Sequence, residues 1–107
     1  GSFVLIEGAG GLYSPIAEAT LNVDLAVELQ LPVLIVIRDE LGAISQALLT
    51  LEAAKKNKLT VACVVLNVVN SNNLSNKEAL AAYTETPIIS FSQGDLGAFC
   101  SEIEKLI

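Results

Sequence analysis

The 107-residue sequence contains no histidine, no tryptophan and no methionine, and it has only two cysteines, Cys63 and Cys100. Without histidine and without a Cys-x-x-Cys spacing, neither a zinc site nor a cysteine–histidine nucleophile is expected. Cys63 lies in an apolar run and Cys100 follows Phe99 in a segment with the pattern of an amphipathic helix. We therefore expect both thiols to be reduced and to lie in the core.

Charged residues are scarce, and basic ones are the scarcest. The chain has 6 basic residues against 12 acidic ones, for a net charge of -6. The basic residues form no cluster that would neutralise a polyphosphate backbone, so nucleic acid is not an expected partner.

Long apolar runs are also lacking. The longest, Val33–Ile37 and Val61–Leu66, are far shorter than the ~20 residues of a membrane-spanning helix. The sequence opens on a strand-like run rather than on a charged leader followed by an apolar core. We therefore expect no membrane partner and a cytoplasmic location.

Apolar residues, in contrast, are abundant, at 52% of the chain with a mean hydropathy of +0.59. Phe3–Ile6, Val33–Ile37 and Val61–Leu66 are continuous apolar runs rather than alternating ones, which is typical of strands covered by helices on both faces. They recur about every 30 residues, the interval that a βαβ unit requires.

The segments between these runs have helical or loop patterns. Pro32 ends a helix predicted over about residues 20–30, and lysines at positions 55, 56 and 58 suit the C-terminal end of a second helix with an apolar face over residues 44–54. Residues 67–76, rich in Asn and Ser, predict a surface loop. We expect further elements as a helix over about 75–84, a strand at Pro87–Phe91 and a helix from Gln93–Leu96 to Ile107, with Asp95 near its start.

The order of these elements is β-α-β-α-β-α-β-α. Right-handed crossovers between such strands favour a parallel doubly wound sheet. We therefore expect one α/β domain over residues 1–107, cut off at its N-terminal side.

The first strand-like run leads directly into the block Glu7-Gly8-Ala9-Gly10-Gly11. In open parallel sheets, ligands bind just beyond the carboxyl ends of the strands. Glycines there let backbone N–H groups approach a phosphate or a carboxylate, and Glu7 is suited to hold Mg²⁺ against the ligand's oxygens. The alternative is a tight turn without a ligand. The spacing is not that of a dinucleotide-binding Gly-x-Gly-x-x-Gly motif.

Two more strand ends carry candidate residues. The helix that follows the second run begins near Leu41, Gly42, Ala43, Ile44 and Ser45, and free N–H groups at a helix start bind anions. The alternative is a loop in which Ser45 or Asp39 caps the helix. Asn67 ends the third run with an amide that matches the edge of a nucleobase, although an asparagine that begins a turn is equally natural there.

These three segments, in this order, resemble the dethiobiotin synthetase family. The resemblance covers about residues 2–92 and includes Glu-Gly-Ala-Gly-Gly after a strand, Leu-Gly-Ala-Ile-Ser-Gln-Ala-Leu-Leu-Thr-Leu-Glu, and Val-Ala-Cys-Val-Val-Leu-Asn. The family closes the ureido ring of dethiobiotin from 7,8-diaminopelargonic acid, CO₂ and ATP with Mg²⁺. The resemblance implies a P-loop NTPase type of fold, and a reaction in which ATP phosphorylates a carbamate that the second amine then attacks. Catalysis of this kind is mainly positioning and charge neutralisation.

The resemblance also implies roles for particular residues. Glu7 matches the family's catalytic, Mg²⁺-binding glutamate, and Gly8 lies with it on the nucleotide side. Gly10 and Gly11 match backbone positions beside the diamine and the phosphates. Asn67 matches an asparagine that contacts the nucleobase. The segment from Leu41 to Ser45 matches the helix start that, in a homodimer, reaches the substrate carboxylate of the partner subunit.

The sequence departs from the family pattern at three places. It contains no Gly-x-x-x-x-Gly-Lys-Thr, so the triphosphate loop with its lysine and Mg²⁺-binding threonine is absent, together with a further Mg²⁺-binding aspartate. We therefore expect the chain to be the C-terminal half of an enzyme, completed by a segment of roughly 100 residues, and inactive alone. Ser45-Gln46 replaces the usual Asn-His, and Ser92-Gln93 stands where a proline often shapes the adenine pocket.

Two other functions fit the same residues. One is a related P-loop amidoligase, such as an enzyme that acts on cobyrinic acid. The other is a binding or regulatory module that kept the scaffold and lost catalysis. A Gly-x-x-x-x-Gly-Lys-Thr motif upstream of this chain would favour an enzyme over such a module.

Overall fold

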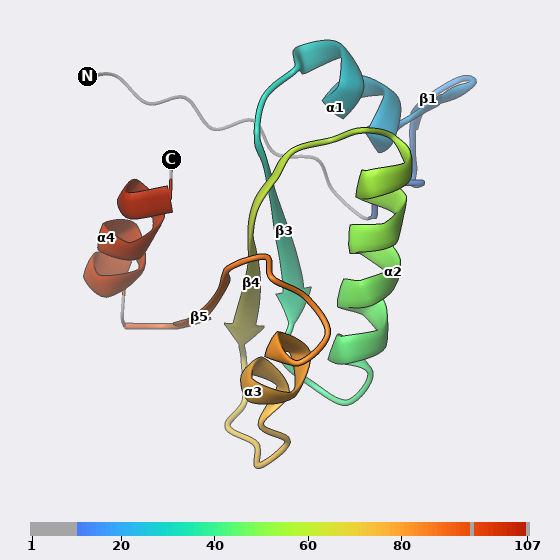
Figure 1. Cartoon of the computed structure of the whole chain (residues 1–107). Coiled ribbons are helices and arrows are strands. Elements are labelled where there is room, and N and C mark those ends of the chain that lie inside the picture. The colour runs from blue at the N-terminus through green and yellow to red at the C-terminus, as the bar shows by residue number, and fades with distance from the viewer. Residues whose placement is uncertain (1–10, 95, 107) are drawn as a thin grey trace.

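A computed structural model of the chain describes residues 11–94 and 96–106 (Figure 1). Two short strands come first, and three longer strands then alternate with helices. The elements are β1 (Pro15–Ala17), β2 (Thr20–Leu21), α1 (Asn22–Leu29), β3 (Val33–Arg38), α2 (Ala43–Lys56), β4 (Val61–Val68), α3 (Asn76–Ala81), β5 (Ile88–Ser92) and α4 (Leu96–Leu106).

Strands β3, β4 and β5 form a parallel sheet in that order. Their register aligns Arg38 with Asn67 and Asn67 with Phe91, so the three carboxyl ends meet at one edge of the sheet. The predicted parallel α/β architecture is therefore confirmed for these strands. The strand expected at Phe3–Ile6 lies outside the described residues.

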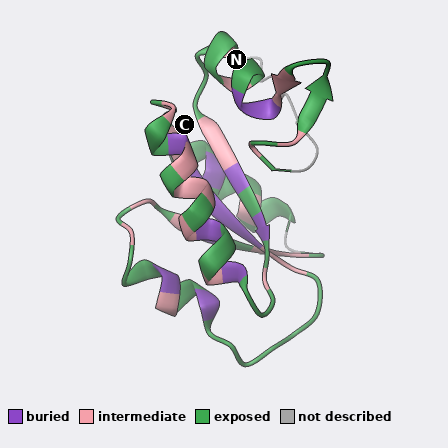
Figure 2. Cartoon of the chain, turned by 90° about the vertical axis from the view of Figure 1, so that its right-hand side faces the viewer, coloured by how far each residue is buried: buried purple, intermediate pink, exposed green. Residues whose placement is uncertain are grey.

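Helices cover both faces of this sheet, as the continuous apolar runs predict. Figure 1 shows α2 and α4 on opposite sides of the strands, and Figure 2 shows the buried residues gathered on the strands and on the helix sides that face them. The core on the α2 face contains the buried residues Ile35, Ile37, Ala43, Ala47, Val64, Leu66 and Leu80. The core on the α4 face contains Cys63, Val65, Ile89 and Ile103, with Phe91 and Phe99 packed edge to face at 4.9 Å.

The antiparallel pair of β1 and β2 was not predicted from the sequence. Its strands are three and two residues long, and β1 is exposed throughout. A pattern of alternating apolar and polar residues needs four or more positions to be recognisable, so strands of this length leave no periodic signal.

The boundaries after β4 differ from the prediction. Strand β4 continues through Asn67 and Val68, because both residues pair with β5 at Phe91 and Ser92. The predicted loop therefore begins two residues later, at Val69. Helix α3 ends at Ala81 and is shorter than the helix predicted over 75–84.

The two cysteines do not share one environment. Cys63 is fully buried in β4, as predicted, and burial raises the pKa of its thiol. The prediction of a buried Cys100 is wrong, because this residue is exposed. Helix α4 turns Phe99 and Ile103 toward the sheet, and a residue one position after Phe99 points away from that face.

Candidate functional site

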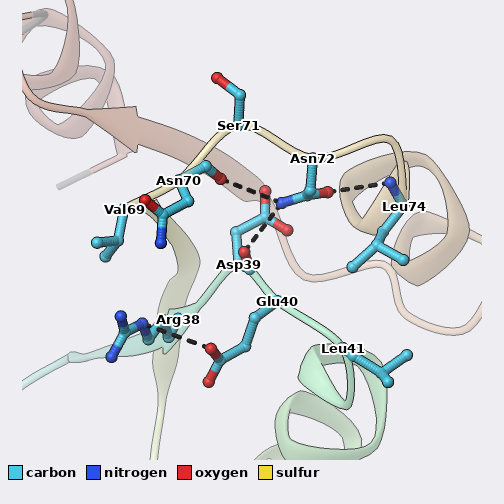
Figure 3. Close-up of a pocket in the computed structure, with 9 residues that line it drawn as sticks. All are labelled: Arg38, Asp39, Glu40, Leu41, Val69, Asn70, Ser71, Asn72 and Leu74. Atoms are coloured by element: carbon cyan, nitrogen blue, oxygen red, sulfur yellow. Dashed lines mark hydrogen bonds and ion pairs between the residues drawn. The ribbon is translucent and has the colours of Figure 1, made fainter.

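The loops that leave β3 and β4 enclose a shallow pocket of about 210 Å³ at the carboxyl edge of the sheet (Figure 3). Open parallel sheets bind ligands at this edge. One wall comes from the segment between β3 and α2, and the other from the segment between β4 and α3. The lining residues are Arg38, Asp39, Glu40, Leu41, Val69, Asn70, Ser71, Asn72 and Leu74.

Asp39 joins the two walls of this pocket. Its backbone N–H donates to the carbonyl oxygen of Asn67 at 2.8 Å, which extends the β3–β4 ladder by one residue. Its own carbonyl oxygen accepts a hydrogen bond from Asn72 Nδ2 at 3.0 Å (Figure 3). Asn72 Oδ1 in turn accepts from the backbone N–H of Leu74 at 3.0 Å, so the second wall is itself held in a turn.

Asn76, the first residue of α3, supports the pocket from below its surface. The residue is 6% exposed, and its Nδ2 donates to Asp39 Oδ1 at 2.7 Å and to the carbonyl oxygen of Glu40 at 3.1 Å. A buried amide with both hydrogens bonded satisfies the general requirement that buried polar groups be paired. The loop before α2 is therefore fixed by a residue 36 positions further along the chain.

The charges around the pocket are partly paired. Arg38 Nε and Glu40 Oε2 are 3.5 Å apart, and their side chains are 56% and 54% exposed. An ion pair with such exposure is screened by water and adds little stability. The Asp39 carboxylate is held by Asn76 instead.

Helix α2 begins with free backbone donors. Its N-cap residue, Gly42, has φ +94, a left-handed conformation that favours glycine. Ala43 N–H donates to Glu40 O at 3.0 Å, whereas the N–H groups of Ile44 and Ser45 have no hydrogen-bond partner among residues 11–94 and 96–106. No side chain caps the helix, so the alternative of a cap by Ser45 or Asp39 is wrong. Free N–H groups and the helix dipole together favour an anion at this position.

Asn67 lies in β4 and not at the start of a turn. Its side chain is half buried and makes no hydrogen bond within the described part of the chain. Because side chains alternate along a strand, Asn67 shares the α4 face of the sheet with Cys63 and Val65. Asn67 and the start of α2 thus meet at one edge of the sheet but on opposite faces.

Gly11 lies away from these groups. Its N–H donates to Ser14 Oγ at 2.9 Å, and its carbonyl oxygen accepts from Asn22 Nδ2 at 2.9 Å. Two residues later, Tyr13 Oη accepts from Asn57 Nδ2 at 3.4 Å, at the C-terminal end of α2. Since the 14 residues of α2 span about 21 Å, the structure does not bring Gly11 together with the start of that helix. Glu7, Gly8 and Gly10 lie outside the described residues.

The described residues form no metal centre by themselves. Nowhere in 11–94 and 96–106 do three or more Asp, Glu, Cys or His side chains gather closely enough to hold a metal ion. Glu7 lies outside the described residues, and Mg²⁺ ligation by this residue stays a prediction. No helix in that part is long and apolar enough to cross a membrane.

Sequence reasoning missed Asn72 and Asn76 as residues that shape the site. Both belong to the Asn/Ser-rich segment that predicts a loop, and composition alone gives no sign of which asparagine reaches back to Asp39. The one available signal is position, because this segment follows the strand end that carries Asn67.

Parallel strands with helices on both faces, and loops that form a pocket at the carboxyl edge, make the described part an α/β domain, and its match to the AAA domain family assigns it to the P-loop NTPase type. Comparison with known families agrees with this class. A model of the AAA domain family matches residues 2–91, and the chain belongs to this family.

Curated relatives share a more specific name. The chain is 50% identical over 105 residues to the ATP-dependent dethiobiotin synthetase BioD of Vesicomyosocius okutanii, covering 98% of this chain and 49% of that protein. It is 43% identical over the same length to the enzyme of that name from Ruthia magnifica, with equal coverage. It is 36% identical over 103 residues to the Bacillus cereus (strain B4264) enzyme, covering 92% and 43%. The resemblance stated from the sequence is confirmed, and the chain spans about half the length of these relatives.

Proposed function

We propose that the protein containing this chain is an ATP- and Mg²⁺-dependent ligase that closes the ureido ring of dethiobiotin from 7,8-diaminopelargonic acid and CO₂. The observation that carries the proposal is the 50% identity, over 98% of this chain, to a protein named ATP-dependent dethiobiotin synthetase. The proposal includes a cytoplasmic location and a homodimer.

The start of α2 supplies the supporting chemistry on the substrate side. The unpaired N–H groups of Ile44 and Ser45 suit a carboxylate, and 7,8-diaminopelargonic acid carries one. Leu41 precedes them and is 86% exposed, with the exposed side chains of Val69 and Leu74 across the pocket. Exposed apolar residues beside an anion site favour a contact with a second subunit, in which this helix start faces the partner's substrate.

Asn67 supplies the supporting chemistry on the nucleotide side. Its amide can donate and accept at once, as the paired edge of a nucleobase requires, and no residue of the described part occupies it. Ring closure through a phosphorylated carbamate depends on holding the two substrates in place, and the proposal gives that task to these two positions. Glu7, Gly8, Gly10 and Gly11 remain predicted contacts with Mg²⁺, diamine and phosphates.

The proposal is tested with the full-length protein, by following ATP hydrolysis and dethiobiotin formation with the diamine, bicarbonate and Mg²⁺. We expect phosphate release that depends on the diamine and a product with the mass of dethiobiotin. If calorimetry shows binding of cobyrinic acid and no heat of binding for the diamine, the protein is a related amidoligase and not a dethiobiotin synthetase. If the folded protein binds neither substrate and shows no turnover, a non-catalytic module is the remaining interpretation. The 107-residue chain alone is expected not to turn over, because it contains no Gly-x-x-x-x-Gly-Lys-Thr.

Glu7→Gln tests the predicted metal ligand in the same assay. Replacing the carboxylate with an amide of equal size removes the charge that holds Mg²⁺, so turnover is expected to fall by orders of magnitude while the melting temperature stays the same. Glu18→Gln, an exposed carboxylate on the β1–β2 turn, is the matched control. Unchanged activity of Glu7→Gln would remove this residue from the site.

A further inference from the structure

We propose that Asp39 is a positioning residue that holds the start of α2 and the end of β4 in one fixed arrangement. The inference rests on the proposed function for the meaning of these two segments, since they are the substrate side and the nucleotide side of that reaction. Asp39 itself is assigned no contact with a ligand. Its role follows from the partners of its backbone N–H, its carbonyl oxygen and its carboxylate, which lie in three different segments.

Each polar group of Asp39 binds a different part of the chain. The N–H reaches the carbonyl oxygen of Asn67 in β4 at 2.8 Å. The carbonyl oxygen accepts from Asn72 in the following loop at 3.0 Å, and the carboxylate accepts from Asn76 at the start of α3 at 2.7 Å. One residue therefore links the loop before α2 to the end of β4, to the loop that follows β4 and to the start of α3.

The carboxylate bond is the one that a side-chain substitution removes. Asn76 is 6% exposed and divides its two donor hydrogens between Asp39 Oδ1 and Glu40 O. A hydrogen bond to an ionised acceptor is stronger than a neutral one, and its loss leaves a donor in a place with little water. Without the carboxylate, the Asn76 amide holds the loop by its Glu40 bond alone.

The loop held in this way leads into the anion-binding turn. Glu40 O accepts from Ala43 N–H at 3.0 Å, so the atom that Asn76 holds also orients the first turn of α2. Gly42 lies between them and adopts φ +94, a backbone conformation that residues other than glycine rarely take. The direction of the free Ile44 and Ser45 N–H groups thus depends on the Asp39–Asn76 contact.

The expected functional consequence is on turnover more than on binding. When the Asp39 side chain is altered, its backbone hydrogen bonds to Asn67 and Asn72 remain, but the loop before α2 loses its carboxylate link to α3. The start of α2 can then shift relative to the end of β4, and a displacement of about 1 Å costs up to about a hundredfold in rate. In the full-length protein, Asp39→Ala and Asn76→Ala are expected to lower kcat at least about tenfold. The dissociation constants of ATP and of the diamine, each measured alone, should change less than about threefold.

Two variants sharpen this test. Asp39→Asn keeps an oxygen that accepts from Asn76, and it should retain kcat to within about threefold. Asn73→Ala is the matched control, because Asn73 lies in the same exposed loop and its side chain makes no hydrogen bond within the described residues. It should behave as the unaltered protein.

A second readout needs no activity. Hydrogen exchange on the unliganded protein should be about fivefold faster at residues 40–43 and 69–75 in Asp39→Ala and Asn76→Ala than in Asn73→Ala. If the unaltered protein has no dethiobiotin synthetase activity, the proposed function fails, and this exchange comparison alone then decides whether Asp39 fixes the two segments.

Three results would overturn the inference. One is unchanged exchange in both segments. Another is faster exchange with undiminished kcat in an active protein. The last is an equal loss of kcat, of both ligand affinities and of melting temperature, which is the result expected of a residue needed only for folding.

Discussion

Asn67 divides its polar groups between the fold and the candidate site. Its backbone pairs with β3 and β5, and its carbonyl oxygen also receives the N–H of Asp39. Its side chain takes no part in these bonds. A substitution of the side chain therefore tests ligand contact without disturbing the sheet.

Asn67→Ala is expected to weaken ATP binding to the full-length protein about tenfold, because under the proposed function the lost amide makes paired hydrogen bonds to the base. The diamine affinity and the melting temperature should stay the same. Calorimetry with ATP measures the effect, and Asn73→Ala serves as the control. An unaltered ATP affinity in Asn67→Ala would mean that the base lies elsewhere.

The two cysteines show how burial sets the reactivity of a single residue. Cys63 is fully buried and its pKa is raised by desolvation, whereas Cys100 is exposed on α4. The thiolate is the reactive form, and a raised pKa together with lack of access suppresses it.

In the native 107-residue chain, a thiol reagent at neutral pH is therefore expected to modify Cys100 and to spare Cys63. In denaturant both should react, since Cys63 then regains an ordinary pKa. Mass spectrometry after digestion identifies the modified residue, and a Cys100→Ser chain should take up no label until it unfolds. Rapid labelling of Cys63 in the native chain would contradict its place in the core.

At the scale of the element, α2 combines a strong helical sequence with an unusual start. Its apolar side buries Ala43, Ala47 and Ala54, and lysines at positions 55 and 56 lie at the C-terminal end, where the dipole favours positive charge. Its first turn, in contrast, depends on the left-handed Gly42 and on the loop held by Asp39 and Asn76. The helix is thus stabilised by its own sequence, but its direction is set by other segments.

Gly42→Ala is expected to destabilise the protein by about 1 to 2 kcal/mol, because an L residue at φ +94 is strained. A Cβ added there has no heavy atom within 4 Å, so the loss comes from the backbone and not from a clash. Denaturant unfolding measures it. Gly97→Ala is the matched control, since Gly97 lies within α4 with equally open space and no positive φ, and alanine there should be neutral or stabilising. Equal effects of the two substitutions would contradict this account.

At the scale of the whole molecule, the described residues leave part of the sheet's apolar surface uncovered. Among the described residues, β3 pairs only with β4, and Val36 on this edge strand is 62% exposed. An exposed apolar strand at the edge of a sheet is a site of association between chains. The relatives are about twice as long as this chain, so they have further segments that can cover such a surface.

The isolated 107-residue chain is therefore expected to associate at micromolar concentration, and Val36→Lys should shift it toward the monomer, because a lysine on an edge strand opposes pairing. Analytical ultracentrifugation measures the effect. Val27→Lys is the control, since Val27 on α1 is also exposed, at 46%, but belongs to no strand. A monomeric unaltered chain, or an equal effect of Val27→Lys, would show that the β3 edge is not the contact.

Much of the sheet was predictable. The runs Val33–Ile37 and Val61–Leu66 are continuous and apolar, and both are strands with helices on either side. The sequence proposed candidate residues at the helix start after β3 and at Asn67, and the structure brings both to the carboxyl edge of the sheet. Their roles in ligand binding stay predictions. The exposure of Cys100 was not predictable, because the helical pattern does not specify which side of the helix faces the sheet. The β1–β2 pair was not predictable either, because strands of two or three residues show no alternating pattern.

The amino-acid sequence by itself determined the alternation of strands and helices from β3 to α4 and the resemblance to dethiobiotin synthetases, because continuous apolar runs and motif blocks are local features of the chain. Only the tertiary structure decided that Asn72 and Asn76 reach back to Asp39, that Asn67 and the start of α2 lie on opposite faces of one edge, and that Tyr13, two residues after Gly11, meets the C-terminal end of α2. Contacts between residues more than 30 positions apart arise from packing, and no local pattern records them.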